Sequence, residues 1–333
     1  MKKIIIPVVA FILGTILIFA AKDSQKTPSV LESPELSKRV WQVKSVDTMK
    51  YSRDLTGEKL NDPTFDKTIE IQVKNIAGLG ATHVALGTPY DERFIPYLSR
   101  WVAAARRNNL KVWFRGNFSG WEGWFGYEKN LTREGHLELM REFVNKNGGL
   151  FENGDLFTPC PECENGGAGD PRRTGDVEGF RTFLIEEFQA ANVEFRKIGK
   201  NVRTVGSANY DVASLIYNEQ TANAVGDLIV IDHYVKSPQE LAEDIRSLNQ
   251  KSQAKILLGE LGVPIPDIHG KLTEEEQAAW IKEALELISR QEEVIGINYW
   301  VSYGGSTAIF KNDNNPKPAA EVLKKNFSLA DLN

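Results

Sequence analysis

The 333-residue sequence has few of the residues that build metal and redox sites, with only two cysteines and four histidines. Cys160 and Cys163 form one Cys-x-x-Cys pair, and no second pair supplies the further ligands that a zinc site needs. No two histidines form the His-x-His pair typical of metal-dependent hydrolase barrels. We therefore expect no metal and no cofactor, and a local disulfide between Cys160 and Cys163 is plausible in an exported protein.

The chain also lacks an excess of positive charge, since its formal net charge is -5. A nucleic-acid partner would favour a basic face, so we expect none. No Gly-x-Gly-x-x-Gly follows the first expected strand, which argues against a dinucleotide-binding fold. No repeat of the solenoid type is visible.

An apolar run near the N-terminus stands apart from the rest of the chain. Lys2 and Lys3 precede residues 4–21, a pattern typical of an export signal. The run approaches the ~20 residues that span a bilayer, so residues 1–21 fit either a cleaved signal peptide or a signal anchor in the membrane. Residues 22–39 are a polar linker in composition. In both cases we expect an extracytoplasmic protein, secreted or membrane-anchored.

From residue 40 to residue 327, short apolar runs alternate with longer amphipathic stretches, which indicates βα units and a parallel sheet. The expected strands are Val40–Val46, His83–Gly87, Lys111–Gly116, Leu156–Pro161, Val202–Ser207, Leu228–Asp232, Lys255–Gly259 and Gly296–Val301. Helical periodicity fits between them. The pattern predicts an α/β fold, a (β/α)8 TIM barrel over residues 40–327, followed by a tail at 328–333.

Two glutamates stand where expected strands end. Glu162 follows the fourth strand and Glu260 follows the seventh. The carboxyl ends of barrel strands converge on one face, and two carboxylates on that face are what glycoside hydrolysis requires. Glu164, two residues beyond Glu162, is a second candidate for the fourth-strand acid, or a ligand for a sugar hydroxyl.

At these positions the chain resembles the retaining (β/α)8 glycoside hydrolases of the cellulase and mannanase superfamily, related to glycoside hydrolase family five. The resemblance covers about residues 40–327 and rests on short motifs. It implies that Glu162 is the acid/base and Glu260 the nucleophile. The chain departs from the family at Pro161, where an Asn usually precedes the acid. Glu162 and Glu164 therefore both stay candidates, and the strand-end position favours Glu162.

Other strand ends carry residues suited to a sugar site. Arg115 and Asn117 follow the third strand, and Arg115 could keep Glu260 ionised by its opposite charge. Asn209, after the fifth strand, could bind a hydroxyl.

The resemblance adds three aromatic candidates at strand ends. It implies that His233 or Tyr234, after the sixth strand, contacts the nucleophile or the reacting sugar. It also implies that Trp300, at the end of the eighth strand, forms a platform under the cleaved sugar. Each of these residues could instead serve only in packing or ordinary hydrogen bonds.

The loop after the third strand interleaves aromatic residues with glycines over residues 118–127. Such a sequence suits a loop that presents flat faces to a sugar ring. Trp121 and Trp124 are the candidates, with a small core over the barrel rim as the alternative.

The sequence thus predicts a retaining glycoside hydrolase that cleaves O-glycosidic bonds of an oligo- or polysaccharide by a two-glutamate double displacement. The alternative is a barrel that binds glycan at the cell surface without cleaving it.

Overall fold

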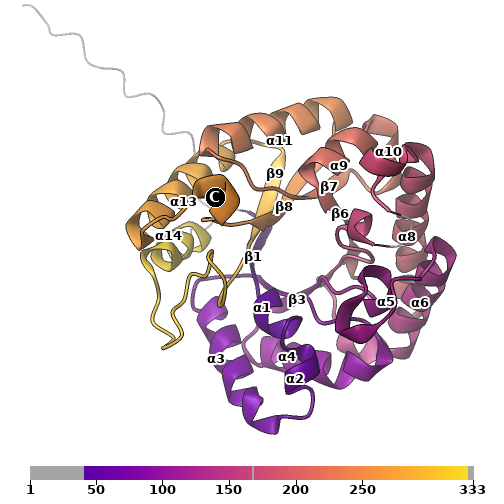
Figure 1. Ribbon diagram of the computed structural model, residues 1–333, viewed down its shortest axis with the longest axis horizontal. Coiled ribbons are helices and arrows are strands. Elements are labelled where there is room, and N and C mark those ends of the chain that lie inside the picture. The colour runs from indigo at the N-terminus through magenta and orange to yellow at the C-terminus, as the bar shows by residue number, and fades with distance from the viewer. Residues whose placement is uncertain (1–40, 167–168, 329–333) are drawn as a thin grey trace, which may run out of the picture. The chain divides into compact units, whose positions relative to one another are not determined.

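The structure is a computed structural model that describes residues 41–166 and 169–328. A parallel sheet closes into a barrel inside a ring of helices (Figure 1). Its strands are β1 (Val43–Asp47), β2 (His83–Leu86), β3 (Lys111–Phe114), β4 (Leu156–Phe157), β5 (Arg203–Thr204), β6 (Gly206–Asn209), β7 (Leu228–Asp232), β8 (Lys255–Leu261) and β9 (Val294–Tyr299). The longer helices are α3 (Asp66–Ala77), α4 (Ile95–Arg107), α6 (Arg133–Lys146), α8 (Val177–Lys197), α11 (Pro238–Ser252), α13 (Glu274–Ile288) and α14 (Pro318–Phe327).

Shorter helices lie in the loops between these elements. They are α1 (Met49–Ser52), α2 (Thr56–Lys59), α5 (Ser119–Glu122), α7 (Pro171–Thr174), α9 (Tyr210–Ile216), α10 (Glu219–Ala224) and α12 (Pro266–His269). Of these, α1 follows β1 and α5 follows β3, so both stand at the carboxyl ends of barrel strands (Figure 1).

The strands β5 and β6 are two parts of one barrel strand. The strand order is β5-β4-β3-β2-β1-β9-β8-β7-β6, with β5 paired to β4 and β6 to β7. Only Val205 separates them, and its N–H donates to the carbonyl of Phe157 in β4 at 2.9 Å. The order therefore closes on itself, which confirms the expected α/β (β/α)8 TIM barrel.

The fourth strand is shorter than the expected Leu156–Pro161, because β4 contains only two residues. Pro159 and Pro161 have no N–H to donate to a sheet ladder. The chain leaves the barrel after Phe157, so Glu162 lies in the loop beyond the strand and not at its end.

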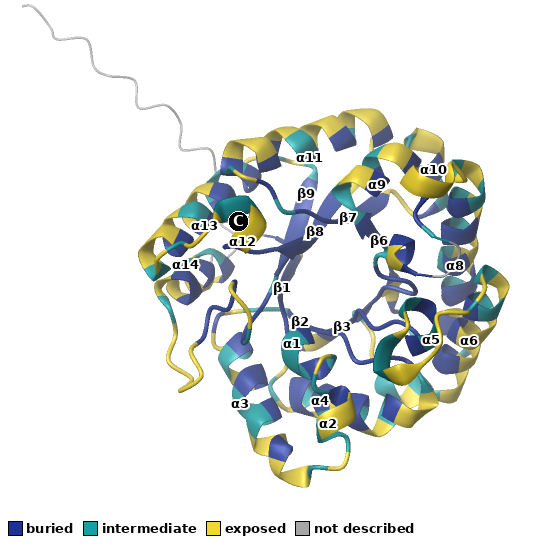
Figure 2. Ribbon diagram, viewed as in Figure 1, coloured by how far each residue is buried: buried dark blue, intermediate teal, exposed yellow. Residues whose placement is uncertain are grey.

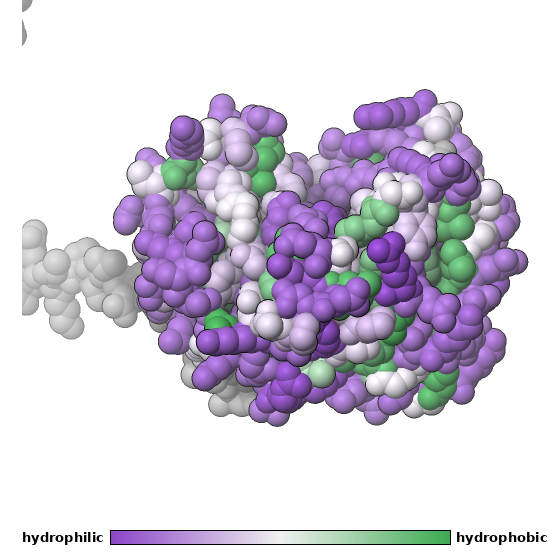
Figure 3. All heavy atoms as spheres, turned by 60° about the horizontal axis from the view of Figure 1, so that its bottom comes forward, coloured by the Kyte–Doolittle hydropathy of each residue, from purple (hydrophilic) through white to green (hydrophobic). Residues whose placement is uncertain are grey.

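The apolar core has two parts. One fills the inside of the barrel and comprises Val43, Ala85, Trp113, Leu156, Val205, Leu228, Val230, Leu257 and Ile295. A larger one lies between the sheet and the inward faces of the helices (Figure 2). The face in Figure 3 is mostly hydrophilic, with apolar side chains in small separate patches and a hollow at its upper edge.

The expected signal or anchor (residues 1–21), the linker (22–39) and all but the first residue of the tail lie outside the described residues. Among residues 41–166 and 169–328, no helix has both the length and the apolar composition needed to cross a bilayer.

Gly296 offers a test of the β1–β9 contact. A Cβ added there would lie 2.1 Å from the backbone carbonyl oxygen of Val43. Gly296→Ala should therefore lower the free energy of unfolding by at least ~2 kcal/mol, measured by urea titration. Gly149, where an added Cβ meets nothing within 4 Å, is the matched control. Equal stability of the two alanine variants would contradict the barrel register.

Candidate active site

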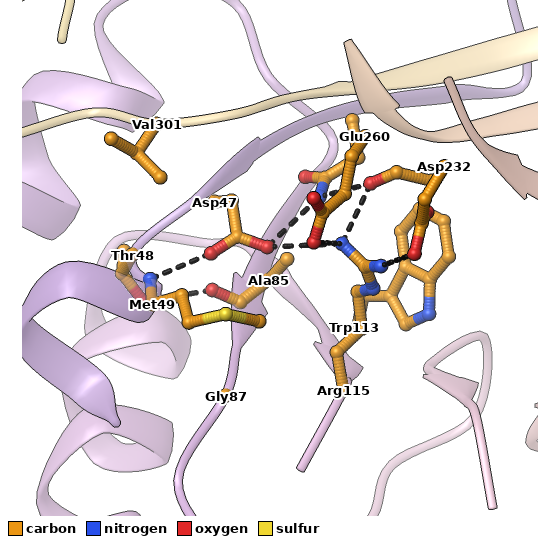
Figure 4. Close-up of polar contacts among 12 residues, drawn as sticks. Asp47, Thr48, Met49, Ala85, Gly87, Trp113, Arg115, Asp232, Glu260 and Val301 are labelled. Carbon is orange, nitrogen blue, oxygen red and sulfur yellow. Dashed lines mark hydrogen bonds and ion pairs between the residues drawn. The ribbon is translucent and has the colours of Figure 1, made fainter. Parts of the chain in front are cut away.

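Arg115 lies at the centre of the barrel mouth, directly above the inner core. It follows β3, and its guanidinium carbon lies 5.4 Å from the centre of the Trp113 ring. Its Nη2 donates to Asp232 Oδ2 at 2.8 Å, and its Nη1 donates to Asp47 Oδ2 at 3.2 Å and lies 3.4 Å from Glu260 Oε1 (Figure 4). In the part of the chain that the structure describes, these three buried carboxylates have no other ion-pair partner.

A break in the strand register directs Glu260 into the mouth. The pairing of β8 with both neighbours shifts around Gly259, between Leu258 and Glu260. Such a bulge turns the following side chain toward the barrel axis. The carbonyl of Gly259 accepts from Arg115 Nη1 at 2.7 Å and from Asn298 Nδ2 at 2.8 Å. An added Cβ there would lie 2.3 Å from Asp232 Oδ1, so this approach requires glycine.

Glu260 receives a second donor from the next strand. The hydroxyl of Tyr234, which follows β7, donates to Glu260 Oε2 at 2.6 Å. Each oxygen of Glu260 therefore faces a donor or a positive charge, and both favour the ionised carboxylate.

Glu162 approaches this carboxylate from the β4 loop. Glu162, Asp232 and Glu260 each offer a carboxylate oxygen, and the three oxygens lie within 4.8 Å of one another. The spacing of Glu162 and Glu260 fits the ~5–5.5 Å of a retaining pair and is shorter than the ~6.5–9.5 Å of an inverting pair.

Glu162 and Glu260 are both shielded from water, and their negative charges repel each other. Burial first, and then the neighbouring carboxylates, raise the pKa of both Glu162 and Glu260 to about 8. Among the described residues the Glu162 carboxylate has one hydrogen-bond donor, Asn165 Nδ2 at 2.8 Å, whereas Glu260 has Tyr234 and Arg115. When the pair holds one proton, that proton therefore resides on Glu162. In this state an acid stands beside an ionised carboxylate.

A disulfide encloses Glu162. Cys160 and Cys163 are bonded to each other, which confirms the expected local disulfide, and both are buried. Within this short ring Glu162 has φ 43°, in the left-handed region that costs a non-glycine residue about 1–2 kcal/mol. The carbonyl of Cys163 also accepts from Trp121 Nε1 at 3.1 Å. The disulfide therefore restricts the loop to conformations that keep the carboxyl over the mouth.

The carboxylates Glu162, Asp232 and Glu260 are also the groups that could hold a divalent cation. The Arg115 guanidinium already lies 2.8 Å from Asp232 and 3.4 Å from Glu260, so a positive charge occupies this place. The donor set therefore fits a compensated acid cluster better than a metal site.

Known structures share this architecture. The chain matches fungal β-1,4-galactanases with a TM-score of 0.61 at 14% identity, over 86% of this chain and 100% of that one. It matches a family 5 xyloglucanase from Paenibacillus pabuli with a TM-score of 0.58 at 12% identity, over 78% and 90%. For a β-D-glucuronidase of Dictyoglomus thermophilum the TM-score is 0.57 at 19% identity, over 88% of this chain and 51% of that one. The chain has the fold of these glycosidases. No protein-family model matches it, and no curated protein matches it in sequence.

Two expected site residues, Glu164 and Asn209, bind each other. Glu164 is buried, and its Oε1 accepts from the backbone N–H and the Nδ2 of Asn209 at 2.7 and 3.0 Å. This pair fastens the β4 loop to the end of β6. Of the two acids considered for the fourth strand, Glu162 is the one the structure brings near Glu260.

Asn117 and Trp121 are buried under the rim. Asn117 Oδ1 lies 2.8 Å from His136 Nε2, and its Nδ2 donates to Glu122 at 3.3 Å. Trp121 stacks on Phe183 with ring centres 5.4 Å apart. The loop after β3 therefore forms the alternative satellite core at this position, because large aromatic surface is removed from water there.

His233 also points away from the mouth. Its Nε2 lies 2.8 Å from Asp244 Oδ2 on α11, and its ring stacks on Tyr210 at 4.1 Å. Trp124 and Trp300 remain half-exposed. The Trp300 ring lies edge-on to Tyr234 at 6.0 Å, so it stands beside the Glu260 donor.

Three acids of the site were not predicted from the sequence. Asp47 ends β1 and Asp232 ends β7, so the strand-end rule that found Glu260 applies to both. A third acid, Glu122, lies in the loop after β3, where burial raises its pKa to about 7. The sequence pattern of that loop indicated only its aromatic residues as candidates.

The raised pKa values make stability depend on pH. A carboxyl with a raised folded-state pKa favours folding below its unfolded pKa and loses this contribution as pH rises through the folded value. Glu162→Gln should therefore raise the melting temperature at pH 8 by roughly 2–4 °C, with a smaller rise at pH 5. Differential scanning calorimetry measures both. Exposed Glu186, changed to Gln, is the control. A lower melting temperature for Glu162→Gln at pH 8 would refute the shared burial.

Proposed function

We propose that the chain is a retaining glycoside hydrolase that cleaves an O-glycosidic bond of an oligo- or polysaccharide. The observation that carries this proposal is the pair Glu162 and Glu260, with oxygens within 4.8 Å at the barrel mouth. The fold shared with galactanases and a xyloglucanase agrees with it. Those names make β-linked glycans the first substrates to screen.

In the first step, an oxygen of Glu260 forms a bond to the anomeric carbon. The bond from that carbon to the leaving oxygen breaks, and the leaving oxygen takes the proton of Glu162. Arg115 and Tyr234 hold Glu260 ionised and oriented before the attack.

In the second step, Glu162 is ionised and takes a proton from water. The water oxygen bonds to the anomeric carbon, and the bond to Glu260 breaks. Glu162 thus serves as acid and then as base, which suits a pKa raised to about 8 by burial.

The half-exposed rings of Trp124 and Trp300 are the proposed sugar platforms. Apolar CH groups of a pyranose pack on such faces at little cost in rotamer entropy. Asn117, Trp121 and His233 position the loops around the site. Glu164 and Asn209 hold the β4 loop, and so act through Glu162.

We also propose an extracytoplasmic location. The Cys160–Cys163 disulfide supports it, because disulfides persist in oxidising compartments. The run at residues 4–21 would supply the export signal or the membrane anchor.

The two glutamates should respond differently to the leaving group. Glu162→Ala should lower kcat/KM for a 4-methylumbelliferyl glycoside by roughly 10²–10⁴-fold. It should affect kcat/KM for a 2,4-dinitrophenyl glycoside much less, because that leaving group needs no proton in the first step. Glu260→Ala should abolish hydrolysis of both. Binding of substrate without any hydrolysis by the unchanged chain would favour the glycan-binding alternative.

The disulfide should matter for proton donation specifically. Replacing Cys160 and Cys163 with serine should lower kcat/KM for the 4-methylumbelliferyl glycoside by roughly 10–100-fold, the effect of a displacement near 1 Å. The 2,4-dinitrophenyl glycoside should lose less. An equal loss for both substrates, or no loss, would show that the disulfide does not position Glu162.

A further inference from the structure

Helix α1 and the residue after it carry two cations at the rim of the mouth. Asp47 Oδ1 accepts from the N–H of Met49 at 2.6 Å, which fixes the start of α1 to the same carboxylate that faces Arg115. Lys50 lies in α1, and Arg53, three residues further along, directly follows the helix. Figure 4 shows Asp47 and Met49, which precede them in the chain.

Lys50 lies beside the aromatic ring of Trp300. Its Nζ is 5.4 Å from the centre of the Trp300 ring. Trp300 in turn meets Tyr234, the donor to Glu260. Gly304 leaves room for the Lys50 side chain, since an added Cβ would lie 3.1 Å from Lys50 Cβ. The ammonium group is thus held where a sugar over Trp300 could reach it.

Arg53 lies beside the second half-exposed indole. Its guanidinium carbon is 4.9 Å from the centre of the Trp124 ring. Its Nε donates to Asp54 Oδ1 at 2.9 Å, while Nη1 and Nη2 have no hydrogen-bond partner among the described residues. Two donors in a planar fork therefore remain for a ligand.

The charges of α1 and the residues directly after it do not cancel. Asp54 pairs with both cations, at 3.1 Å from Lys50 Nζ and 2.9 Å from Arg53 Nε, so one positive charge is left over. Lys50 and Arg53 side chains are 32% and 25% exposed, so a ligand can reach them. Of the other acids nearby, Asp47 faces Arg115, whereas Glu122 is near enough to Arg53 for this cation to oppose the burial that raises the Glu122 pKa.

We propose that the sugar bound over Trp300, next to Glu260, carries an anionic substituent that Lys50 and Arg53 bind. A neutral sugar does not need two cations placed on its platforms, whereas a carboxylate or a sulfate ester pairs with both. The inference rests on the proposed function, and it narrows the substrate class to glycans with uronic acid or sulfated units.

Hydrolysis of charged and neutral glycosides by the full chain tests whether the substrate carries an anionic substituent. The probes are 4-methylumbelliferyl β-D-glucuronide, the β-D-galacturonide, the 6-sulfated β-D-glucoside and the neutral β-D-glucoside and β-D-galactoside. We expect a lower KM for an anionic probe than for its neutral counterpart, and a rise of that KM in 0.5 M NaCl. Preference for uronides over the sulfated probe identifies carboxylate, and the reverse identifies sulfate.

Variants that remove one charge test whether Lys50 and Arg53 cause the preference for an anionic sugar. Lys50→Met and Arg53→Met should each raise the ratio of the anionic to the neutral KM by about tenfold, the scale of one charge-assisted hydrogen bond. Lys50→Arg should restore most of the preference. Lys282→Met, on exposed α13, is the control and should leave the ratio unchanged. Thermal melts check that each variant is folded.

Binding separates this inference from the proposed function. The Glu260→Gln variant should bind free glucuronate or 6-sulfoglucose more tightly than glucose in calorimetry, and Lys50→Met in that background should remove the difference. Hydrolysis with no preference for an anionic sugar overturns the inference and leaves the glycosidase proposal intact. Preferred binding of the anionic sugar without hydrolysis supports the inference and overturns the glycosidase proposal.

Discussion

The buried guanidinium of Arg115 is the interaction on which the mouth of the barrel depends. Asp47, Asp232 and Glu260 reach it from three different strands. Without a cation, three carboxylates out of water would repel one another, and a single uncompensated buried charge costs about 3–5 kcal/mol. Trp113 supports the guanidinium from below, so the inner core of the barrel fixes the position of the site's charge.

The single positive charge of Arg115 cannot neutralise all the carboxylates around it. The uncompensated negative charge favours a proton on one of the two glutamates, Glu162 and Glu260, which catalysis requires. Glu260 has Arg115 and the Tyr234 hydroxyl, whereas Glu162 has only an amide donor. The same burial thus leaves one glutamate ionised and the other protonated. The β4 loop holds Glu162 in this role through a left-handed backbone, a disulfide and the Glu164–Asn209 contact.

Much of the fold could be predicted from the sequence, because buried parallel strands appear in it as short apolar runs. Functional residues were also expected at the carboxyl ends of barrel strands. This expectation identified Arg115, Tyr234 and Glu260, which the structure brings together. It missed Asp47, which also ends a strand, because a lone acid after a strand resembles any solvated residue.

Other features depend on tertiary contacts that no local pattern specifies. The direction of His233 is decided by Asp244 on another element, and the burial of Trp121 by Phe183 on α8. The length of β4 was overestimated because two prolines end the ladder earlier than the apolar pattern suggests. Lys50 and Arg53 could not be assigned to the mouth before Trp124 and Trp300 were placed beside them.

The central claim is that Glu260 forms a covalent bond to the sugar while Glu162 moves the proton. Incubation with a 2-deoxy-2-fluoro glycosyl fluoride, which slows the second step, followed by peptide mass spectrometry, tests it most directly. The account predicts one added fluorosugar on the peptide that contains Glu260. A label on Glu162, or turnover without any labelled peptide and with inversion at the anomeric carbon, would contradict it.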